Sequence, residues 1–460
     1  MVFPMLADIY FGYNDWMVFF ICIIITAFSG GALILSNMGF SSDINTRQAF
    51  LLTNLTWIIL PTFGALPFWF SSLNMSFTDA FFESMSGITT TGSTVITGLD
   101  YAPKGILLWR AMLQWLGGIG IIIMAMSVLP FLKVGGMQIF KTELSEDEKA
   151  LPRTAQMANS IAIIYIGLTL LCTICYMMTG LESFDAIAHA MTTISTGGFS
   201  TFDTSFSHYT DLGPEIVCIS FMIIGGIPFV LYVKMVRGNI SSLFKDTQVR
   251  WFLSIVLITT IVTSSYLTME QGMTAGEAVR RSMFNIVSLM TGTGFGSGDF
   301  NAWGGFVVSI FFFLMAVGAC AGSTSCGIKI FRFQVLYSVT KVQISKLLHP
   351  NGMFIPHYNG KPMPSDVPSS VMGFFFVYAL GFAFLALALS YVGLDFMTAM
   401  SGAATSISNV GPGLGDIIGP TGTFKPLPDS AKWILSIGML FGRLELFTIL
   451  VMLSPNFWKH

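Results

Sequence analysis

Four glycines recur along the chain at intervals of about 100 residues, each at the end of a polar, hydroxyl-rich stretch. Glycine adopts backbone dihedrals that other residues avoid, so such a strand can present its carbonyl oxygens to a dehydrated cation. One strand supplies one arc of ligands, and four strands around an axis predict a closed ring. The four local sequences are Thr89-Thr-Thr-Gly-Ser93, Ser195-Thr-Gly-Gly-Phe199, Thr291-Gly-Thr-Gly-Phe295 and Ser408-Asn-Val-Gly-Pro412.

A short, semi-apolar segment precedes each glycine, near 78–91, 184–196, 281–292 and 396–408. These segments are too short to cross a bilayer, so we expect re-entrant half-helices whose partially negative C-terminal ends face the ring. A small residue stands twelve positions before each glycine. These residues are Ala80, Ala186, Ser282 and Ala399. The alternative, that the glycines only permit close helix packing, gives no reason for a half-helix before each one.

The composition requires a lipid environment for these segments. Only 10% of the 460 residues are charged, against about 25% in soluble domains, and 53% are hydrophobic. Nine apolar runs are long enough to be candidate membrane spans. They lie near 16–36, 49–70, 105–132, 158–179, 214–236, 251–268, 303–337, 370–391 and 431–453.

Most lysines and arginines fall on one side of these spans, which the positive-inside rule assigns to the cytoplasm. The half-helices then open toward the outside of a multi-pass protein in the cytoplasmic (inner) membrane. Acids follow the ring glycines on that outer side. They either concentrate cations at the mouth or simply cap turns. The four acids are Asp100, Asp203, Asp299 and Asp416.

The predicted fold is an all-α integral membrane protein with four tandem repeats around a central pore. Each repeat runs span, half-helix, filter strand, span, and one extra helix region precedes the first repeat. The predicted boundaries are 1–48 for that region, then 49–132, 133–236, 237–337 and 338–460 for the repeats.

The second span of the third repeat is too long for one straight helix, and small and hydroxyl residues interrupt it at 319–327. Non-helical backbone at membrane depth must be buried in protein or line a cavity. We expect a movable plug below the filter, the alternative being a local kink satisfied by hydroxyl groups. The predicted gating residues in this loop are Ala319, Cys320, Ala321, Gly322, Ser323 and Thr324.

Arg443 lies deep in the last span, where a charge is expensive and therefore a functional candidate. We expect it to hydrogen-bond carbonyls of the 319–327 loop or to act as an electrostatic barrier below the filter. The alternative is that its side chain snorkels to the inner face.

Specific motifs over nearly the whole chain resemble the Trk/Ktr/HKT superfamily of K⁺ transport proteins, and its TrkH-type subunit most closely. The motifs are Thr89-Thr-Thr-Gly, Gly197-Gly-Phe-Ser-Thr, Ala319-Cys-Ala-Gly-Ser-Thr, Asn409-Val-Gly-Pro-Gly-Leu-Gly and Leu440-Phe-Gly-Arg-Leu-Glu. One feature departs from the family, whose members usually carry two helices before the first repeat; here Met1 to Tyr10 is at most a stub of the other helix.

The resemblance implies K⁺ uptake, with K⁺ bound in the filter and no organic cofactor. It also implies a homodimer with one pore per protomer, gated by a cytoplasmic nucleotide-binding, TrkA-like regulatory subunit, with no nucleic acid partner. Relatives that favour Na⁺ carry serine at the first filter glycine, so glycine at all four positions favours K⁺. The filter residues are then Thr90, Thr91, Gly92, Thr196, Gly197, Gly198, Thr291, Gly292, Thr293, Gly294, Asn409, Val410 and Gly411.

Two rival functions remain open at this point. A Na⁺- or H⁺-coupled K⁺ symporter also uses broken helices, but its repeats are often inverted, whereas these four all run in the same orientation. Glu83 and Asp185 lie in half-helices, where an acid can simply stabilise the first turns. A membrane enzyme would need clustered His, Cys, Asp or Glu, and His189 is the one histidine near a membrane segment. We therefore predict a transport protein and not an enzyme.

Overall fold

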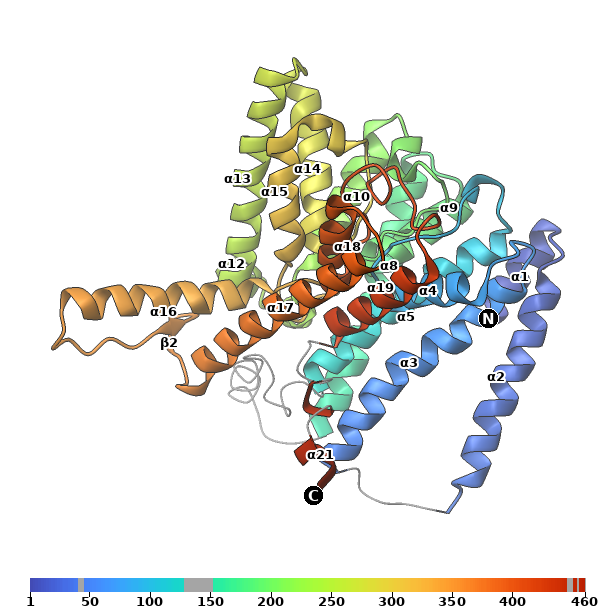
Figure 1. The fold of residues 1–460 in the computed structure, drawn as a ribbon, viewed down its shortest axis with the longest axis horizontal. Helices are drawn as coiled ribbons and strands as arrows, with labels where there is room; N and C mark the ends of the chain where they lie inside the picture. The colour runs from blue at the N-terminus through green and yellow to red at the C-terminus, as the bar shows by residue number, and fades with distance from the viewer. Residues whose placement is uncertain (40–44, 128–151, 445–449, 453–454, 460) are drawn as a thin grey trace.

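The computed structural model describes residues 1–39, 45–127, 152–444, 450–452 and 455–459, and its regular structure is almost entirely helical (Figure 1). In these ranges the named strands are β1 (His357–Tyr358) and β2 (Lys361–Pro362), which pair antiparallel. Asn359 and Gly360 form the turn between them with positive φ values of 50° and 77°, as a two-residue hairpin requires. The predicted all-α class is confirmed.

Six helices of the described ranges are long and apolar enough to cross a membrane. They confirm the predicted spans near 16–36, 49–70, 105–132, 158–179, 251–268 and 370–391, although residues 128–132 lie outside the described ranges. The six are α2 (Trp16–Ser36), α3 (Thr46–Phe70), α5 (Lys104–Ser127), α8 (Pro152–Met178), α13 (Thr247–Glu270) and α17 (Asp366–Tyr391).

The predicted span over 214–236 is present as two helices instead of one. The structure has α10 (Leu212–Gly226) and α11 (Phe229–Val236), bent by 92°. The break falls at Ile227–Pro228, because proline has no N–H to continue the helix and holds the preceding residue extended. Ile227 accordingly has φ −90° and ψ 147°.

The run at 303–337 is broken as predicted. α15 (Gly305–Ala316) and α16 (Ile330–Leu348) are separated by a non-helical loop over 317–329, called the intramembrane loop below. α16 extends sideways away from the body of the molecule (Figure 1). The last predicted span begins as α19 (Asp429–Arg443), and part of its remainder lies outside the described ranges.

All four predicted half-helices are present: α4 (Phe77–Ile88), α9 (Ser183–Ile194), α14 (Ala275–Thr291) and α18 (Phe396–Ser408). α14 begins at Ala275 instead of near 281. The side chains of Ser76, Thr274 and Asp395 cap three of them by accepting a first-turn backbone N–H. Each half-helix is largely buried, so protein surrounds it at membrane depth.

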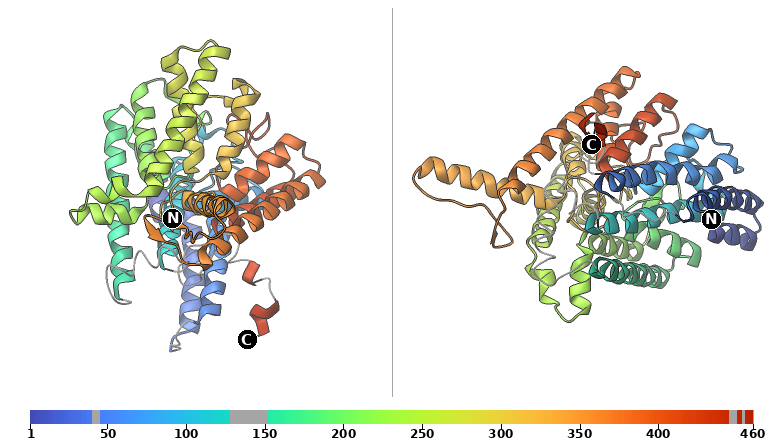
Figure 2. Two further views of the ribbon diagram at one scale, coloured as in Figure 1. Left: turned by 90° about the vertical axis from the view of Figure 1, so that its left-hand side faces the viewer. Right: turned by 90° about the horizontal axis from the view of Figure 1, so that it is seen from below.

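The half-helices link the elements into a cycle. Each packs between the two spans that flank it in sequence: α4 between α3 and α5, α9 between α8 and α10, α14 between α13 and α15, and α18 between α17 and α19. Each also packs against the second span of the preceding unit, α9 on α5, α14 on α10 and α18 on α15. Contact between α19 and α4 closes the cycle, bringing the red C-terminal helices beside the blue N-terminal ones (Figures 1 and 2).

The remaining elements are short. The predicted stub is a ten-residue helix, α1 (Val2–Phe11), which packs on α2 and α5 and ends at Gly12 in the left-handed conformation. The others are α12 (Ser241–Lys245), α21 (Pro455–Lys459) and the 3-10 turns η1 (Leu99–Tyr101), η2 (Ser205–His208) and η3 (Phe300–Trp303).

Candidate ion-conduction site

Each half-helix leads directly into a strand with an unusual backbone, and the four strands share it. The predicted glycines Gly92, Gly198, Gly294 and Gly411 all have positive φ, between 79° and 105°. The residues two positions earlier also have positive φ. These are Thr90, Thr196, Gly292 and Asn409, with φ between 50° and 72°. The residue in between has negative φ in every strand, and this alternation turns successive carbonyl groups toward one side of the strand.

The four strands are neighbours in cyclic order. A Cβ built on each glycine would collide with a carbonyl oxygen of the next strand: Gly92 with Gly197, Gly198 with Thr293, and Gly294 with Val410. Gly411 meets Thr91 of the first strand and closes the ring. The geometry leaves no room for any side chain at these positions.

Few hydrogen-bond donors reach the carbonyl oxygens of the residues that directly precede the four filter glycines. Thr91, Thr293 and Val410 are buried, and no described residue donates a hydrogen bond to their carbonyl oxygens. Buried carbonyls without a donor are uncommon in folded proteins. A dehydrated cation satisfies such oxygens, so the ring has the chemistry of a cation filter.

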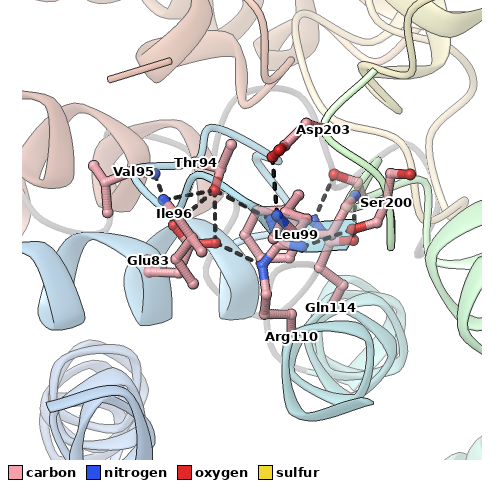
Figure 3. Close-up of polar contacts among 11 residues, drawn as sticks. Glu83, Thr94, Val95, Ile96, Leu99, Arg110, Gln114, Ser200 and Asp203 are labelled. Carbon is pink, nitrogen blue, oxygen red and sulfur yellow. Dashed lines mark hydrogen bonds and ion pairs between the residues drawn. The ribbon is translucent and has the colours of Figure 1, made fainter. Parts of the chain in front are cut away.

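A buried ion pair lies behind the first two strands (Figure 3). Arg110 Nε of α5 donates to Glu83 Oε1 of α4 at 2.8 Å, and both side chains are at most 2% exposed. Glu83 also accepts from Val95 N at 2.9 Å. Arg110 Nη1 donates to the Ser200 carbonyl at 2.7 Å, and its guanidinium lies 4.1 Å from the Phe199 ring centroid. The pair therefore ties the strand of repeat 1 to that of repeat 2.

Side-chain amides and hydroxyls hold the strands as well. Gln114 Nε2 donates to the Gly197 carbonyl at 2.6 Å, and its Oε1 accepts from Phe199 N at 3.0 Å. Asn409 Nδ2 donates to Thr91 Oγ1 and to the Met439 carbonyl, each at 2.9 Å. These bonds connect strand 2 to α5, strand 4 to α19, and strand 4 to strand 1.

The intramembrane loop contacts the end of the filter where the half-helices terminate. Thr324 Oγ1 lies 3.0 Å from the carbonyl oxygens of both Ile194 and Gly225, so its single hydroxyl hydrogen is shared between them. Thr196 Oγ1 lies 3.2 Å from Thr324 Oγ1, and Thr90 Oγ1 forms a 3.5 Å hydrogen bond with Cys326 Sγ. Loop and filter are therefore in direct contact.

The bend between α10 and α11 fastens this loop. Cys320 N donates to the Gly226 carbonyl at 3.2 Å, and Phe229 N donates to the Gly322 carbonyl at 2.9 Å. Within the loop, Ser323 Oγ donates to the Cys320 carbonyl at 2.6 Å. Ala319, Cys320, Ala321, Ser323 and Thr324 are all buried, so every predicted gating residue of the loop except half-buried Gly322 is enclosed by protein.

Arg443 is 2% exposed and points into the protein, so the snorkelling alternative is wrong. The expected bonds to loop carbonyls are also wrong. Nη1 donates to Cys326 Sγ at 2.7 Å, while Nη2 donates to the Gly117 carbonyl of α5 at 2.8 Å. The Trp57 ring lies 5.6 Å from its guanidinium carbon. Arg443 therefore joins the loop to α5 through a sulfur, and Cys326 belongs with the loop residues although the motif did not include it.

A family model described as "Cation transport protein", TrkH, matches residues 15–460. The chain belongs to the TrkH family. The Trk system potassium uptake protein TrkI of Halomonas elongata is 46% identical over 416 residues, 90% of this chain and 84% of the relative. TrkH of Escherichia coli is 36% identical over 437 residues, 94% of this chain and 90% of the relative.

The fold agrees with that assignment. The crystal structure of the potassium transporter TrkH from Vibrio parahaemolyticus matches with a TM-score of 0.92 at 34% identity, over 99% of this chain and 95% of the other. This TrkH family member is accordingly a multi-pass protein of the inner membrane, and a transport protein instead of an enzyme. No described group of three or more His, Cys, Asp and Glu side chains could hold a metal ion.

The outer acids of this TrkH family protein include two that act as caps. Asp203 Oδ2 accepts from Gly98 N at 2.9 Å and Asp203 Oδ1 from Leu99 N at 3.1 Å, which ties the outer loops of repeats 1 and 2 together. Asp299 Oδ1 accepts from Asn301 N at 3.0 Å at the start of η3. Both side chains support turns, as the simpler interpretation expected.

Three buried residues of this TrkH family site are not predicted as site residues from the sequence. Glu83 is expected only to stabilise the first turns of its half-helix, and Arg110 and Gln114 carry no predicted role. A signal did exist, because Arg110 and Gln114 lie one turn apart in an apolar span, where polar side chains need internal partners. Identifying those partners required the fold.

Proposed function

We propose that this chain takes up K⁺ across the cytoplasmic membrane through one pore built from its own four repeats. The observation that carries the proposal is the cyclic ring of four strands whose buried carbonyl oxygens largely lack donors. Relatives named as potassium uptake proteins support K⁺ as the ion. Glycine at all four filter positions further favours K⁺ over Na⁺ in this family.

The proposed K⁺ ligands are backbone carbonyls of the four strands, at 90–92, 196–198, 291–294 and 409–411. The half-helix C-termini add partial negative charge where each strand begins. The proposed repeats follow the boundaries 49–132, 133–236, 237–337 and 338–460, after the region 1–48. Packing of each half-helix between its own two spans supports this division.

The intramembrane loop is the proposed gate. Its direct hydrogen bonds to the inner end of the filter support a plug, since an ion leaving the ring toward the cytoplasm would meet Thr324 and Cys326 first. Arg443 adds a positive charge bonded to Cys326 at this level. A cation would be repelled there until the loop and the arginine move apart.

The proposed assembly is a homodimer with one pore per protomer, gated by a TrkA-like nucleotide-binding subunit on the cytoplasmic side. The loop continues directly into α16, which projects from the body (Figure 1) and carries the basic residues Arg332, Lys341 and Lys346. A force applied to α16 by a partner would therefore reach the loop without an intervening element.

Uptake of Rb⁺ or K⁺ into liposomes that hold the purified protein tests this function, with Na⁺ and Li⁺ as competitors. We expect rapid, downhill uptake that Na⁺ blocks poorly. Uptake that requires a Na⁺ or H⁺ gradient would contradict a simple pore and support a coupled symporter.

Deletion of Cys320–Ser325 tests the gate separately. We expect higher basal Rb⁺ flux in the absence of any partner, because the deletion removes the hydroxyl and thiol groups below the filter. Unchanged flux in folded, monodisperse protein would contradict the plug while leaving the filter proposal standing.

A further inference from the structure

Among the described residues, Gln114 is the one side chain that donates to the carbonyl of a residue just before a filter glycine. Ser93 Oγ donates to a different ring carbonyl, that of the filter glycine Gly411, at 2.7 Å. It is fully buried in α5, one turn after Arg110, and Figure 3 shows both side chains directed toward the strand that carries Ser200. Its two hydrogen bonds, to the Gly197 carbonyl and from Phe199 N, span the filter glycine Gly198. The amide therefore clamps strand 2 across its critical position.

The residue that receives this clamp is itself unusual. Repeat 2 carries Gly197 where the other three strands carry Thr91, Thr293 and Val410. A Cβ on Gly197 would overlap the Gln114 side chain. Glycine is therefore required at position 197 for Gln114 to approach the backbone. This pairing of a glycine with a buried glutamine occurs in repeat 2 and in none of the other three repeats.

We infer that Gln114 is a positioning residue that sets the selectivity of the pore by fixing the Gly197 carbonyl. The inference rests on the proposed function of the ring as a K⁺ filter. A carbonyl held from behind by an N–H cannot tilt inward to follow an ion. Na⁺ is smaller than K⁺ and needs its oxygens closer, so a ring that cannot contract disfavours Na⁺.

A purely structural role for Gln114 predicts a different result. Removing the amide leaves the Gly197 carbonyl and Phe199 N–H without partners, which lowers stability in any buried site. Such a loss reduces the amount of folded protein and the flux of all ions together. A change in the ratio of K⁺ to Na⁺ flux is specific to control of the ring carbonyl.

The decisive variants are Gln114→Leu, which removes both hydrogen bonds, and Gln114→Glu, which keeps the acceptor for Phe199 N but has no N–H for Gly197. We expect both to lower the ratio of K⁺ to Na⁺ flux in proteoliposomes by roughly three- to tenfold, as the loss of one hydrogen bond's net contribution implies. A ratio within about twofold of the parent in either folded variant overturns the inference.

Gln248→Leu is the matched control. Gln248 is also a buried glutamine, but its Oε1 accepts from Ala321 N of the intramembrane loop at 3.0 Å. We expect that variant to change basal flux and to leave the K⁺ to Na⁺ ratio as in the parent. An equal fall in the ratio for Gln248→Leu would show that any buried amide has this effect and would overturn a specific role for Gln114.

Melting temperatures in detergent test the same inference if a variant does not reconstitute well into liposomes. In detergent, K⁺ should raise the melting temperature of the parent more than Na⁺ does, and this margin should shrink in both Gln114 variants. A margin that is unchanged overturns the inference. A parent that shows neither a selective flux nor a K⁺ margin contradicts the proposed function itself, and the two failures are thereby distinguished.

Discussion

The filter strands and the intramembrane loop are both non-helical backbone at membrane depth, yet they differ in how neighbouring protein contacts their backbone. In the loop, backbone groups pair with the bend between α10 and α11 and with Gln248. In the ring, the carbonyls of Thr91, Thr293 and Val410 receive no donor from any described residue. Lipid can satisfy neither segment, so each needs an internal partner.

This difference indicates which segment is built to hold an ion. The loop is fixed to neighbouring protein by backbone hydrogen bonds to the bend between α10 and α11 and to Gln248. The ring is incomplete, because its glycines and left-handed residues gather oxygens without supplying donors to most of them. We therefore expect filter mutations to change which ion passes and how fast, and loop mutations to change only how often it passes.

The largest effect should come from a single methyl group on the ring. Gly198→Ala combines a positive φ of 79°, which disfavours L-residues by about 1–2 kcal/mol, with a collision against the Thr293 carbonyl. We expect Rb⁺ uptake into proteoliposomes to fall roughly 100-fold, because a combined strain of about 3 kcal/mol corresponds to a factor of about 100.

Gly180→Ala is the control for backbone strain alone. Gly180 has φ 93°, but a Cβ there would meet no atom within 4 Å. We expect reduced stability and near-parental uptake. Equal loss of uptake in both variants would mean that backbone strain, and not the collision with the Thr293 carbonyl, explains the effect of Gly198→Ala.

The next effect concerns the ion pair behind strands 1 and 2. Glu83→Gln leaves the Arg110 guanidinium buried without its carboxylate, and breaking such a pair costs about 3–5 kcal/mol. We expect a large drop in the melting temperature in detergent, with a double Glu83→Gln, Arg110→Gln variant less destabilised than the sum of the single ones.

An exposed pair on α14 gives the comparison for that measurement. Glu277 and Arg281 are 44% and 39% exposed, so Glu277→Gln should cost no more than about 0.5 kcal/mol. Similar shifts for Glu83→Gln and Glu277→Gln would contradict a supporting role for the buried pair.

The smallest effect should come from the loop. Thr324→Val keeps the shape of the side chain but removes the hydroxyl hydrogen that the Ile194 and Gly225 carbonyls share. One such bond contributes about 1 kcal/mol, so we expect basal Rb⁺ flux to rise a few-fold. The ratio of K⁺ to Na⁺ flux should stay constant. A changed ratio would contradict the view that the filter alone determines which ion passes.

Repetition made the architecture predictable from sequence. A half-helix, a glycine and a flanking span recur four times, so each copy supports the others, and the ends of α9 and α18 fall within two residues of expectation. The loop was predictable for a different reason, since small and hydroxyl residues from Ala319 onward interrupt an otherwise apolar span.

Features that occur once were missed. The break between α10 and α11 falls at Ile227–Pro228, but the apolar run over 214–236 continues through it, so the sequence predicted one span and not its bend. Glu83 and Arg110 are 27 positions apart, and Arg443 and Cys326 are 117 apart. No local pattern encodes such pairings, because the packing of whole helices brings them together.

The contact between Gly411 and Thr91 also has a consequence for biosynthesis. The two residues are separated by about 320 positions, so at about 5–20 residues per second the first filter strand waits roughly 15–60 s for the last. During that time the Thr91 carbonyl lacks its neighbour Gly411, and the ring is open on that side. The ion site can therefore be completed only after the fourth strand is made, and a nascent chain inserted through only three repeats crosses the membrane without being able to select an ion.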